Sequence, residues 1–441
     1  MSKTNVISES FLCDNIGANE EGNLTFAGFD TVELAKKHGT PLYVVDENKI
    51  REKLRIYKSA MAEYYGHGSF PSYASKALCA KFMYRILEEE NLTADVVSIG
   101  ELYTALSVGF SASNLFFHGN NKTNSDIHFA IDKGCGYFVV DNLEELTEIN
   151  NYSAKLGRVQ KVLIRVSPGI DPHTFKAVAT GNVDSKFGFA IETGQAENIT
   201  AYALGLNNIK LCGFHCHIGS QIFDAEPFID AAHIMFEYMV DIRNKYGYVA
   251  DILNLGGGFG VPYVEADGAI DIINTIKEIG EWLDKRCAEI DYPHPTIIHE
   301  PGRSIVADAG LTLYEVGTVK EITGLKNYVS IDGGMYDNPR FALYEAQYTA
   351  TVANRVTEPK EYLCSLVGRC CESGDIIAED IKLQKPLRGD TVAVFTTGAY
   401  NYTMASNYNR MPRPPIVLLN NKGDSVVVKR ETLDDMLINE I

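Results

Sequence analysis

The sequence predicts a closed (β/α)8 TIM barrel joined to a second, mostly antiparallel β domain. Three observations favour this α/β fold class. Eight short apolar runs alternate with longer amphipathic stretches between residues 46 and 303. Polar residues or glycines end most of these runs, and after residue 303 the chain changes to short alternating strands separated by turns. A flat doubly wound sheet is the alternative for the first part, but a count of eight favours closure.

The eight apolar runs are the expected barrel strands. They span residues 70–75, 94–98, 114–118, 137–141, 161–167, 210–217, 251–255 and 296–299. Helices are expected between them, for example at 81–90, 100–108, 124–133, 143–155, 227–246 and 270–289. Alternating strands and helices indicate parallel pairing through right-handed crossovers.

The second domain is expected to draw on both ends of the chain. Its strands are predicted at 312–323, 327–332, 348–354, 360–367, 391–396 and 415–430, with strand-like pieces at 23–26 and 42–45. We therefore expect a barrel domain over 46–303 and a Greek-key-like β domain built from 1–45 and 304–441.

Composition excludes several classes of function. The formal net charge of −18 argues against nucleic acid or an anionic membrane as a partner, because both require a basic face. No apolar run is long enough to span a bilayer, and no targeting signal is legible. The nine cysteines are scattered without a C-x-x-C pair, which favours a reducing cytoplasm.

Lys76 ends the first expected strand, so its amine would project from the carboxyl face of the barrel, where barrel enzymes build their sites. A lysine there can form a Schiff base if its surroundings lower its pKa. The alternative is a solvated lysine at a strand end.

Two further segments follow the seventh and eighth expected strands. The loop Gly256, Gly257, Gly258 can turn backbone N–H groups toward a phosphate, although a tight turn without a ligand explains the same glycines. The segment Glu300, Pro301, Gly302 and Arg303 offers a carboxylate able to keep a pyridine nitrogen protonated. A structural Glu–Arg ion pair is the alternative there.

His215 and His217 are two residues apart and share one face of the sixth strand. Stacking of one imidazole on an aromatic cofactor is favoured over zinc, because further histidine or cysteine at ligand spacing is not evident, and we expect no metal. In the β domain, Cys371 lies beside Glu372 in a turn, where a thiol could act as a general acid or be structural.

Six ordered motifs together resemble one family. They are Tyr73-Ala74-Ser75-Lys76-Ala77, His217-Ile218-Gly219-Ser220, Gly256-Gly257-Gly258, Glu300-Pro301-Gly302-Arg303, Cys371-Glu372-Ser373-Gly374-Asp375 and Gly398-Ala399-Tyr400. This set resembles the alanine-racemase-like pyridoxal phosphate decarboxylases of fold type III, and within them the diaminopimelate decarboxylases.

The resemblance implies roles for these residues. Lys76 would hold pyridoxal 5'-phosphate covalently, His217 would stack on its ring, and Cys371 would donate the replacing proton. Further cofactor contacts would come from Ser220, Gly256, Gly257, Gly258, Glu300, Pro301, Gly302, Arg303 and Tyr400. Substrate contacts would come from Arg303, Arg340, Tyr344, Glu372 and Tyr400.

The implied reaction is decarboxylation of meso-2,6-diaminopimelate to L-lysine, with arginines suited to the distal carboxylate and Glu372 to the distal ammonium. The resemblance also implies a homodimer in which Cys371 and Glu372 reach the neighbouring subunit's site. Three residues depart from the family pattern, namely Phe175, Arg369 and Phe341, and the last weakens the assignment of Arg340.

Alternatives on the same scaffold are an ornithine, lysine or arginine decarboxylase, a carboxynorspermidine-type relative, or a racemase. A non-catalytic pyridoxal phosphate carrier or regulatory homologue is an alternative of another class. A carrier has no need of a proton donor, so Cys371 argues against it.

Overall fold

The computed structural model describes residues 13–170 and 185–441, which fall into two compact units. The barrel unit comprises residues 53–260 and 269–302, and the β unit comprises the described part of 1–52 together with 261–268 and 303–441. Phe175 lies outside the described residues. Among the described helices, none combines the length and the apolar character that crossing a bilayer requires.

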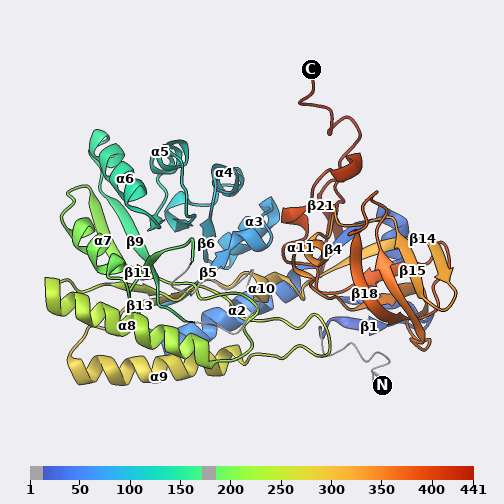
Figure 1. The fold of residues 1–441 in the computed structure, drawn as a ribbon, viewed down its shortest axis with the longest axis horizontal. Helices are drawn as coiled ribbons and strands as arrows, with labels where there is room; N and C mark the ends of the chain where they lie inside the picture. The colour runs from blue at the N-terminus through green and yellow to red at the C-terminus, as the bar shows by residue number, and fades with distance from the viewer. Residues whose placement is uncertain (1–12, 171–184) are drawn as a thin grey trace. The chain divides into compact units, whose positions relative to one another are not determined.

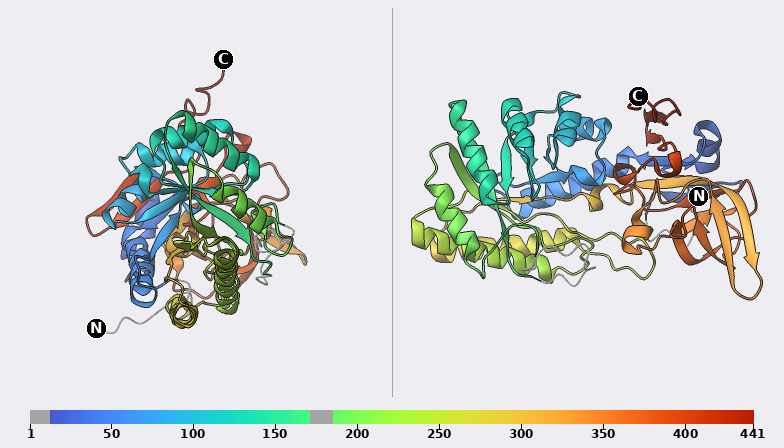
Figure 2. Two further views of the ribbon diagram at one scale, coloured as in Figure 1. Left: turned by 90° about the vertical axis from the view of Figure 1, so that its left-hand side faces the viewer. Right: turned by 45° about the horizontal axis from the view of Figure 1, so that its top comes forward.

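Eight parallel strands close into a ring in the barrel unit (Figure 2). In ring order they are β5 (Phe70–Ala74), β6 (Thr93–Val96), β7 (Leu115–Phe117), β8 (Tyr137–Val140), β9 (Gln160–Ser167), β11 (Ile209–His215), β12 (Ile252–Asn254) and β13 (Thr296–His299). The last strand pairs with the first, so the predicted barrel is confirmed and the flat sheet is excluded. A short strand, β10 (Phe189–Ala190), adds to β9 outside the ring.

Helices surround this ring (Figures 1 and 2). They are α3 (Lys81–Glu89), α4 (Ile99–Leu106), α5 (Asn124–Lys133), α6 (Leu143–Lys155), α7 (Gln195–Leu204), α8 (Glu226–Tyr246) and α9 (Ile272–Ile290). Local sequence fixes several ends. At α5, Thr123 and Asp126 form a reciprocal capping box, and Gly134 closes the helix in the left-handed conformation.

The barrel interior is filled by side chains from almost every strand. One cluster takes a buried residue from each of six strands and packs against Phe70 of β5 and Tyr137 of β8; its members are Phe116, Val139, Leu163, Cys212, Ile252 and Ile298. A cluster that draws on strands all round the ring can form only inside it, so the barrel is a packed core and not a pore.

The β unit is a mixed sheet in which antiparallel pairs predominate (Figure 1). Its strands are β4 (Leu42–Asp46), β14 (Gly310–Ile322), β15 (Lys326–Ile331), β16 (Ala350–Val352), β17 (Tyr362–Val367), β18 (Ile376–Leu383), β19 (Thr391–Val394), β20 (Ile416–Asn420) and β21 (Gly423–Val428). Strand β4 lies between β14, antiparallel, and β20, parallel. Both ends of the chain therefore build this sheet, as predicted.

A smaller three-stranded sheet precedes β4. It consists of β1 (Ile16–Ala18), β2 (Leu24–Phe26) and β3 (Phe29–Asp30), and it is followed by α1 (Thr31–His38), whose N-cap is Asp30. Apolar residues of this segment, among them Leu24, Phe26 and Leu34, pack in one core with Leu313 of β14 and Val417 of β20.

Candidate active site

Lys76 follows β5 in a single 3-10 turn, η2 (Ser75–Ala77), and is exposed between two buried neighbours. The turn is held by Asp95 at the end of β6, whose Oδ1 accepts the Ser75 N–H at 2.8 Å. Burial raises the pKa of Asp95 to about 7, and the nearby charges of His118 and Lys76 oppose that rise. Lys76 therefore lies at the carboxyl end of the barrel strands and interacts electrostatically with the buried side chain of Asp95.

Glu300 follows β13 and is the most heavily hydrogen-bonded carboxylate of this region. His118 Nε2 lies 2.9 Å from its Oε1, His215 Nε2 lies 3.0 Å from its Oε2, and Asn254 Nδ2 donates to Oε1 at 2.7 Å. Burial alone would raise the pKa of Glu300, but His118 and His215 hold it well below its usual range. The side chain is therefore an anion inside the barrel mouth.

The hydrogen bonds to Glu300 determine which nitrogen of His118 and of His215 carries a proton. A carboxylate only accepts hydrogen bonds, so both imidazole Nε2 atoms carry a proton. Burial lowers the pKa of His215 to about 4, so this ring is a neutral donor. Two carboxylate oxygens offer about four acceptor positions, and the described protein donors fill three of them. One position on Oε2 is left for a donor such as a pyridinium N–H.

The glycine loop after β12 is packed on three sides by backbone. A Cβ at Gly256 would lie 2.5 Å from the Cys216 carbonyl oxygen, one at Gly257 would lie 2.2 Å from the Glu300 carbonyl oxygen, and one at Gly258 would lie 2.6 Å from the Gly219 carbonyl oxygen. Within residues 13–170 and 185–441, the N–H groups of Gly257 and Gly258 have no protein acceptor. Close packing against neighbouring backbone therefore requires glycine at these three positions. The loop also offers two N–H donors, which suit an anion.

His217 and Ser220 lie in the loop after β11, next to the glycine loop. The two loops are joined by a hydrogen bond from the Ile222 N–H to the Gly258 carbonyl at 3.1 Å. Burial, then the charges of Lys76 and Arg165, lower the pKa of His217 well below its usual range. A neutral imidazole beside Lys76 is suited to stacking on an aromatic ring.

Pro301 and Gly302 pack against the turn that carries Lys76. The Pro301 carbonyl accepts the Ala74 N–H at 3.1 Å, and a Cβ at Gly302 would lie 2.8 Å from the Ala74 Cβ. The structure thus brings together the predicted residues of the barrel unit at the carboxyl ends of its strands: Lys76, His217, Ser220, Gly256, Gly257, Gly258, Glu300, Pro301 and Gly302.

The predicted residues of the β unit form a second group around Tyr263. Arg303 Nη1 donates to the Tyr263 hydroxyl at 2.8 Å, and its guanidinium lies 4.7 Å from the centre of the Tyr400 ring. Arg340, in α11 (Arg340–Tyr344), packs 4.4 Å from the Tyr263 ring centre and donates to the Tyr348 hydroxyl at 3.0 Å. Both arginines are buried among aromatic rings, so each keeps its charge in a fixed place.

The departures from the family pattern have local explanations in the described part of the chain. Phe341 is buried in α11 next to Arg340, and the arginine is nevertheless held by two tyrosines. Arg369 is exposed, and its N–H donates to the Gly333 carbonyl at 3.0 Å. Tyr344 ends α11 and is partly buried.

Cys371 and Glu372 do not join the Tyr263 group. Both side chains are exposed, and their contacts are with another loop of the β unit. The Cys371 N–H donates to Asn409 Oδ1 at 2.7 Å, and the Tyr408 hydroxyl donates to Glu372 Oε2 at 3.4 Å.

Three residues of the Glu300 environment are not among the predicted site residues, namely His118, Asp95 and Asn254. A signal for Asn254 was present, because it is the one polar residue of the run Ile252-Leu253-Asn254 and directly precedes the glycine loop. For Asp95 the corresponding signal is a carboxylate within the otherwise apolar run after Thr93.

Residues 47–307 match the family model described as pyridoxal-dependent decarboxylase, pyridoxal binding domain. The chain is 44% identical to the diaminopimelate decarboxylase of Bacillus subtilis over 97% of both chains. The chain belongs to the pyridoxal-dependent decarboxylase family. The relative from Staphylococcus aureus, also named diaminopimelate decarboxylase, is 44% identical over 96% of this chain and 98% of its own.

Solved structures of this decarboxylase family agree with the fold. The diaminopimelate decarboxylase of M. jannaschii, in complex with L-lysine, superposes with a TM-score of 0.88 at 35% identity and covers 97% of this chain and 98% of its own. The resemblance of the six motifs to the diaminopimelate decarboxylases is thereby confirmed.

Proposed function

We propose that this chain catalyses the pyridoxal phosphate-dependent decarboxylation of meso-diaminopimelate to L-lysine and carbon dioxide, the last step of lysine biosynthesis. The observation that carries the proposal is the buried anionic Glu300, which keeps one acceptor position in the strand-end group that includes Lys76 and His217. The names of the curated relatives support the choice of substrate.

The donor set of the barrel unit fits pyridoxal phosphate. Lys76 supplies an exposed amine. The N–H groups of Gly257 and Gly258, which no described residue accepts, suit a phosphate, and the acceptor position that the described donors leave on Glu300 suits a pyridinium N–H. When bound, the cofactor supplies an electron sink for the electron pair left by the departing carbon dioxide.

The chain's own residues prepare that chemistry. Glu300 would keep a proton on the ring nitrogen, because three donors stabilise its anionic carboxylate. Neutral His217 would stack on the cofactor ring without adding charge. Arg303 and Arg340, each fixed by tyrosines, are assigned to carboxylates of the substrate. Cys371 donates the proton that replaces the lost carboxylate, and Glu372 binds the distal ammonium.

The homodimer with shared active sites is part of this proposal. Cys371 and Glu372 are exposed in the single chain, whereas their assigned roles require contact with substrate. A second copy that covers this loop would remove both side chains from bulk water. We also propose a cytoplasmic location, which the nine free cysteines support.

The test is a comparison of substrates. Carbon dioxide release is measured from meso-diaminopimelate, L-ornithine, L-lysine and L-arginine with pyridoxal phosphate supplied, and the Lys76→Ala variant is the control for cofactor-dependent turnover. We expect release from diaminopimelate alone, with L-lysine as product, and none from Lys76→Ala. Release mainly from a basic amino acid would overturn the substrate assignment, and unchanged turnover in Lys76→Ala would overturn the role of the lysine.

A further inference from the structure

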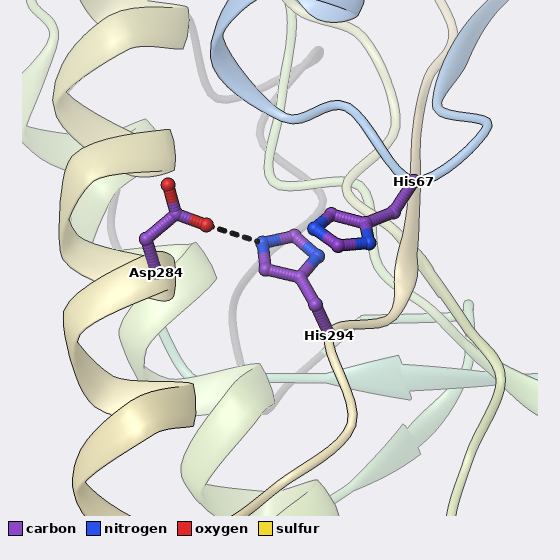
Figure 3. A group of neighbouring side chains, drawn as sticks. All are labelled: His67, Asp284 and His294. Atoms are coloured by element: carbon purple, nitrogen blue, oxygen red, sulfur yellow. Dashed lines mark ion pairs between the residues drawn. The ribbon is translucent and has the colours of Figure 1, made fainter.

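Two histidines and an aspartate converge at one place in the barrel unit (Figure 3). Both histidines precede barrel strands, so the group lies at the amino ends of the strands, whereas Lys76 follows the carboxyl end of β5. His67 lies in the turn before β5, His294 lies in the turn before β13, and Asp284 projects from α9. One ligand atom of each residue lies within 4.8 Å of the others. All three belong to the barrel unit.

The hydrogen bonding of His294 shows which of its nitrogens is available. Its Nδ1 lies 2.9 Å from the Pro295 carbonyl oxygen, which can only accept, so Nδ1 carries the proton. In the neutral ring, Nε2 then presents a lone pair. The side chain is 6% exposed, and Nε2 is buried and has no hydrogen-bond partner among the described residues.

Nε2 of His294 faces another acceptor. Asp284 Oδ1 lies 3.3 Å from it without forming a hydrogen bond, which is the separation of two ligand atoms that each lie about 2.0 Å from one tetrahedral ion. A metal ion can bind the neutral imidazole and the carboxylate together.

His67 supplies the third ligand after a change of side-chain rotamer. Its ring stacks on that of His294 with centroids 4.3 Å apart and planes inclined by 15°. Imidazole lone pairs lie in the ring plane, so two stacked rings do not point at one ion. The His67 side chain is exposed and can turn about its side-chain bonds toward the ion. Two imidazoles and a carboxylate, with water in the open position, suit zinc and its neighbours in the first transition row.

We propose that His67, Asp284 and His294 bind one divalent transition-metal ion, typified by zinc, which ties together the first and last strands of the barrel. Few backbone hydrogen bonds join these two strands. Strands β13 and β5 share only the pairs Ile298–Phe70 and His299–Pro71, and Pro71 has no N–H to donate.

Two hydrogen bonds already reinforce this seam beside the proposed ion. Thr296 Oγ1 donates to the His67 carbonyl at 3.0 Å, and the Ile297 N–H donates to Ser69 Oγ at 2.9 Å. An ion held by the turns before both strands would add to the same connection. Its role is structural, since stability-related features of barrels concentrate at the amino ends of the strands.

Zinc binding to the full-length protein tests the proposal independently of turnover. After chelation and dialysis, Zn²⁺ binding is titrated calorimetrically in wild type, His294→Ala and His67→Asn; asparagine is chosen because residue 67 has a positive φ of 48°. We expect at least a tenfold weaker Zn²⁺ affinity in both variants. A rise in Tm on adding Zn²⁺ is expected in wild type and not in either variant.

The matched control is His128→Ala. His128 Nε2 also pairs with a carboxylate, Glu148, at 2.6 Å, but its ring stacks on Tyr152 and not on a second histidine. This variant should bind Zn²⁺ as wild type does, and every protein compared keeps the same cysteines. Unchanged affinity in both His294→Ala and His67→Asn, or no Zn²⁺-dependent rise in Tm in wild type, would overturn the proposal. Because the His67 side chain is exposed, His67→Asn remains informative even if His294→Ala fails to fold.

Discussion

At the scale of single residues, several histidines of the barrel are held neutral inside it. His299 is fully buried, with Nε2 2.9 Å from the Tyr65 hydroxyl and Nδ1 3.3 Å from the Gly256 carbonyl. Burial lowers its pKa to about 4 from an ordinary value of 6.5. His215 behaves in the same way beside Glu300. Such residues make the stability of the barrel depend on pH.

We predict that stability falls between about pH 6.5 and pH 4. As pH decreases, the unfolded chain binds a proton to residue 299 before the folded protein does, so the free energy of unfolding decreases across that window and is unaffected by this group above it. His299→Gln should reduce the slope of unfolding free energy against pH by up to about 1.4 kcal/mol per pH unit. Urea unfolding at a series of pH values measures this, and parallel curves for variant and wild type would contradict it.

The planar guanidinium of Arg340 leads to a second prediction at this scale. Lysine keeps the charge but loses both the stacking on Tyr263 and the geometry of the bond to Tyr348. We expect Arg340→Lys to lower kcat/KM for meso-diaminopimelate about tenfold or more, mainly through KM. Steady-state kinetics provide the measurement, with the exposed Arg55→Lys as the control. Equal kcat/KM values for Arg340→Lys and wild type would remove Arg340 from the substrate contacts.

The sequence predicts Lys76, His217 and Glu300 as site residues because each lies at the end of an apolar run, and barrel topology makes those ends meet. It does not predict that His118 and Asn254 form hydrogen bonds with Glu300. Those contacts depend on which side chains of three separate strands point inward at one level, and that register follows from closure of the ring. No pattern within any one strand encodes it.

At the scale of elements, the loop after β12 is shaped by the strands beside it. Gly257 has no space for a side chain, because the Glu300 carbonyl oxygen would lie 2.2 Å from a Cβ. Movement of either backbone would displace Glu300 or the N–H groups of Gly257 and Gly258, for which the described part of the chain offers no acceptor. The glycine is therefore needed for packing whether or not it also binds phosphate.

We predict that Gly257→Ala weakens binding of pyridoxal phosphate and destabilises the protein by about 1–3 kcal/mol, as overpacking of a core does. Titration with the cofactor, followed by its visible absorbance, and thermal unfolding measure the two effects. Gly100→Ala is the control, since Gly100 lies in α4 with its nearest neighbour 3.6 Å from a Cβ. Wild-type cofactor affinity in Gly257→Ala would show that the loop can adapt.

Elements with strong local patterns were predicted, and the missed ones have physical reasons. Helix α2 (Glu47–Tyr64) begins in the β unit and ends in the barrel unit, so it follows a strand that is not part of the ring. Helix α7 carries few charges to mark its outer face. Strand β18 is interrupted by Glu379 and Asp380, the latter with a positive φ of 53°, and its pairing with β17 is irregular.

At the scale of the whole molecule, the proposed homodimer predicts complementation between two inactive variants. If Cys371 serves the neighbouring subunit's site, a mixed dimer of Lys76→Ala and Cys371→Ala has one site in which both residues are intact. Random mixing would then restore about a quarter of wild-type turnover. Turnover is measured after the two variants are mixed, dissociated and reassociated. No recovery, with mixed dimers present by mass spectrometry, would mean that each chain uses its own cysteine.

The placement of β4 in the middle of its sheet has a consequence for synthesis on the ribosome. Val45 of β4 pairs on one side with Gly310 of β14, which lies more than 260 residues later in the chain. On its other side, Val45 pairs with Leu418 of β20. At about 5–20 residues per second, Leu42–Asp46 therefore emerges on the order of ten seconds or more before either partner strand exists. During that interval a mostly apolar strand that includes Val44 and Val45 has two unpaired edges, which makes it a natural binding site for a chaperone on the nascent chain.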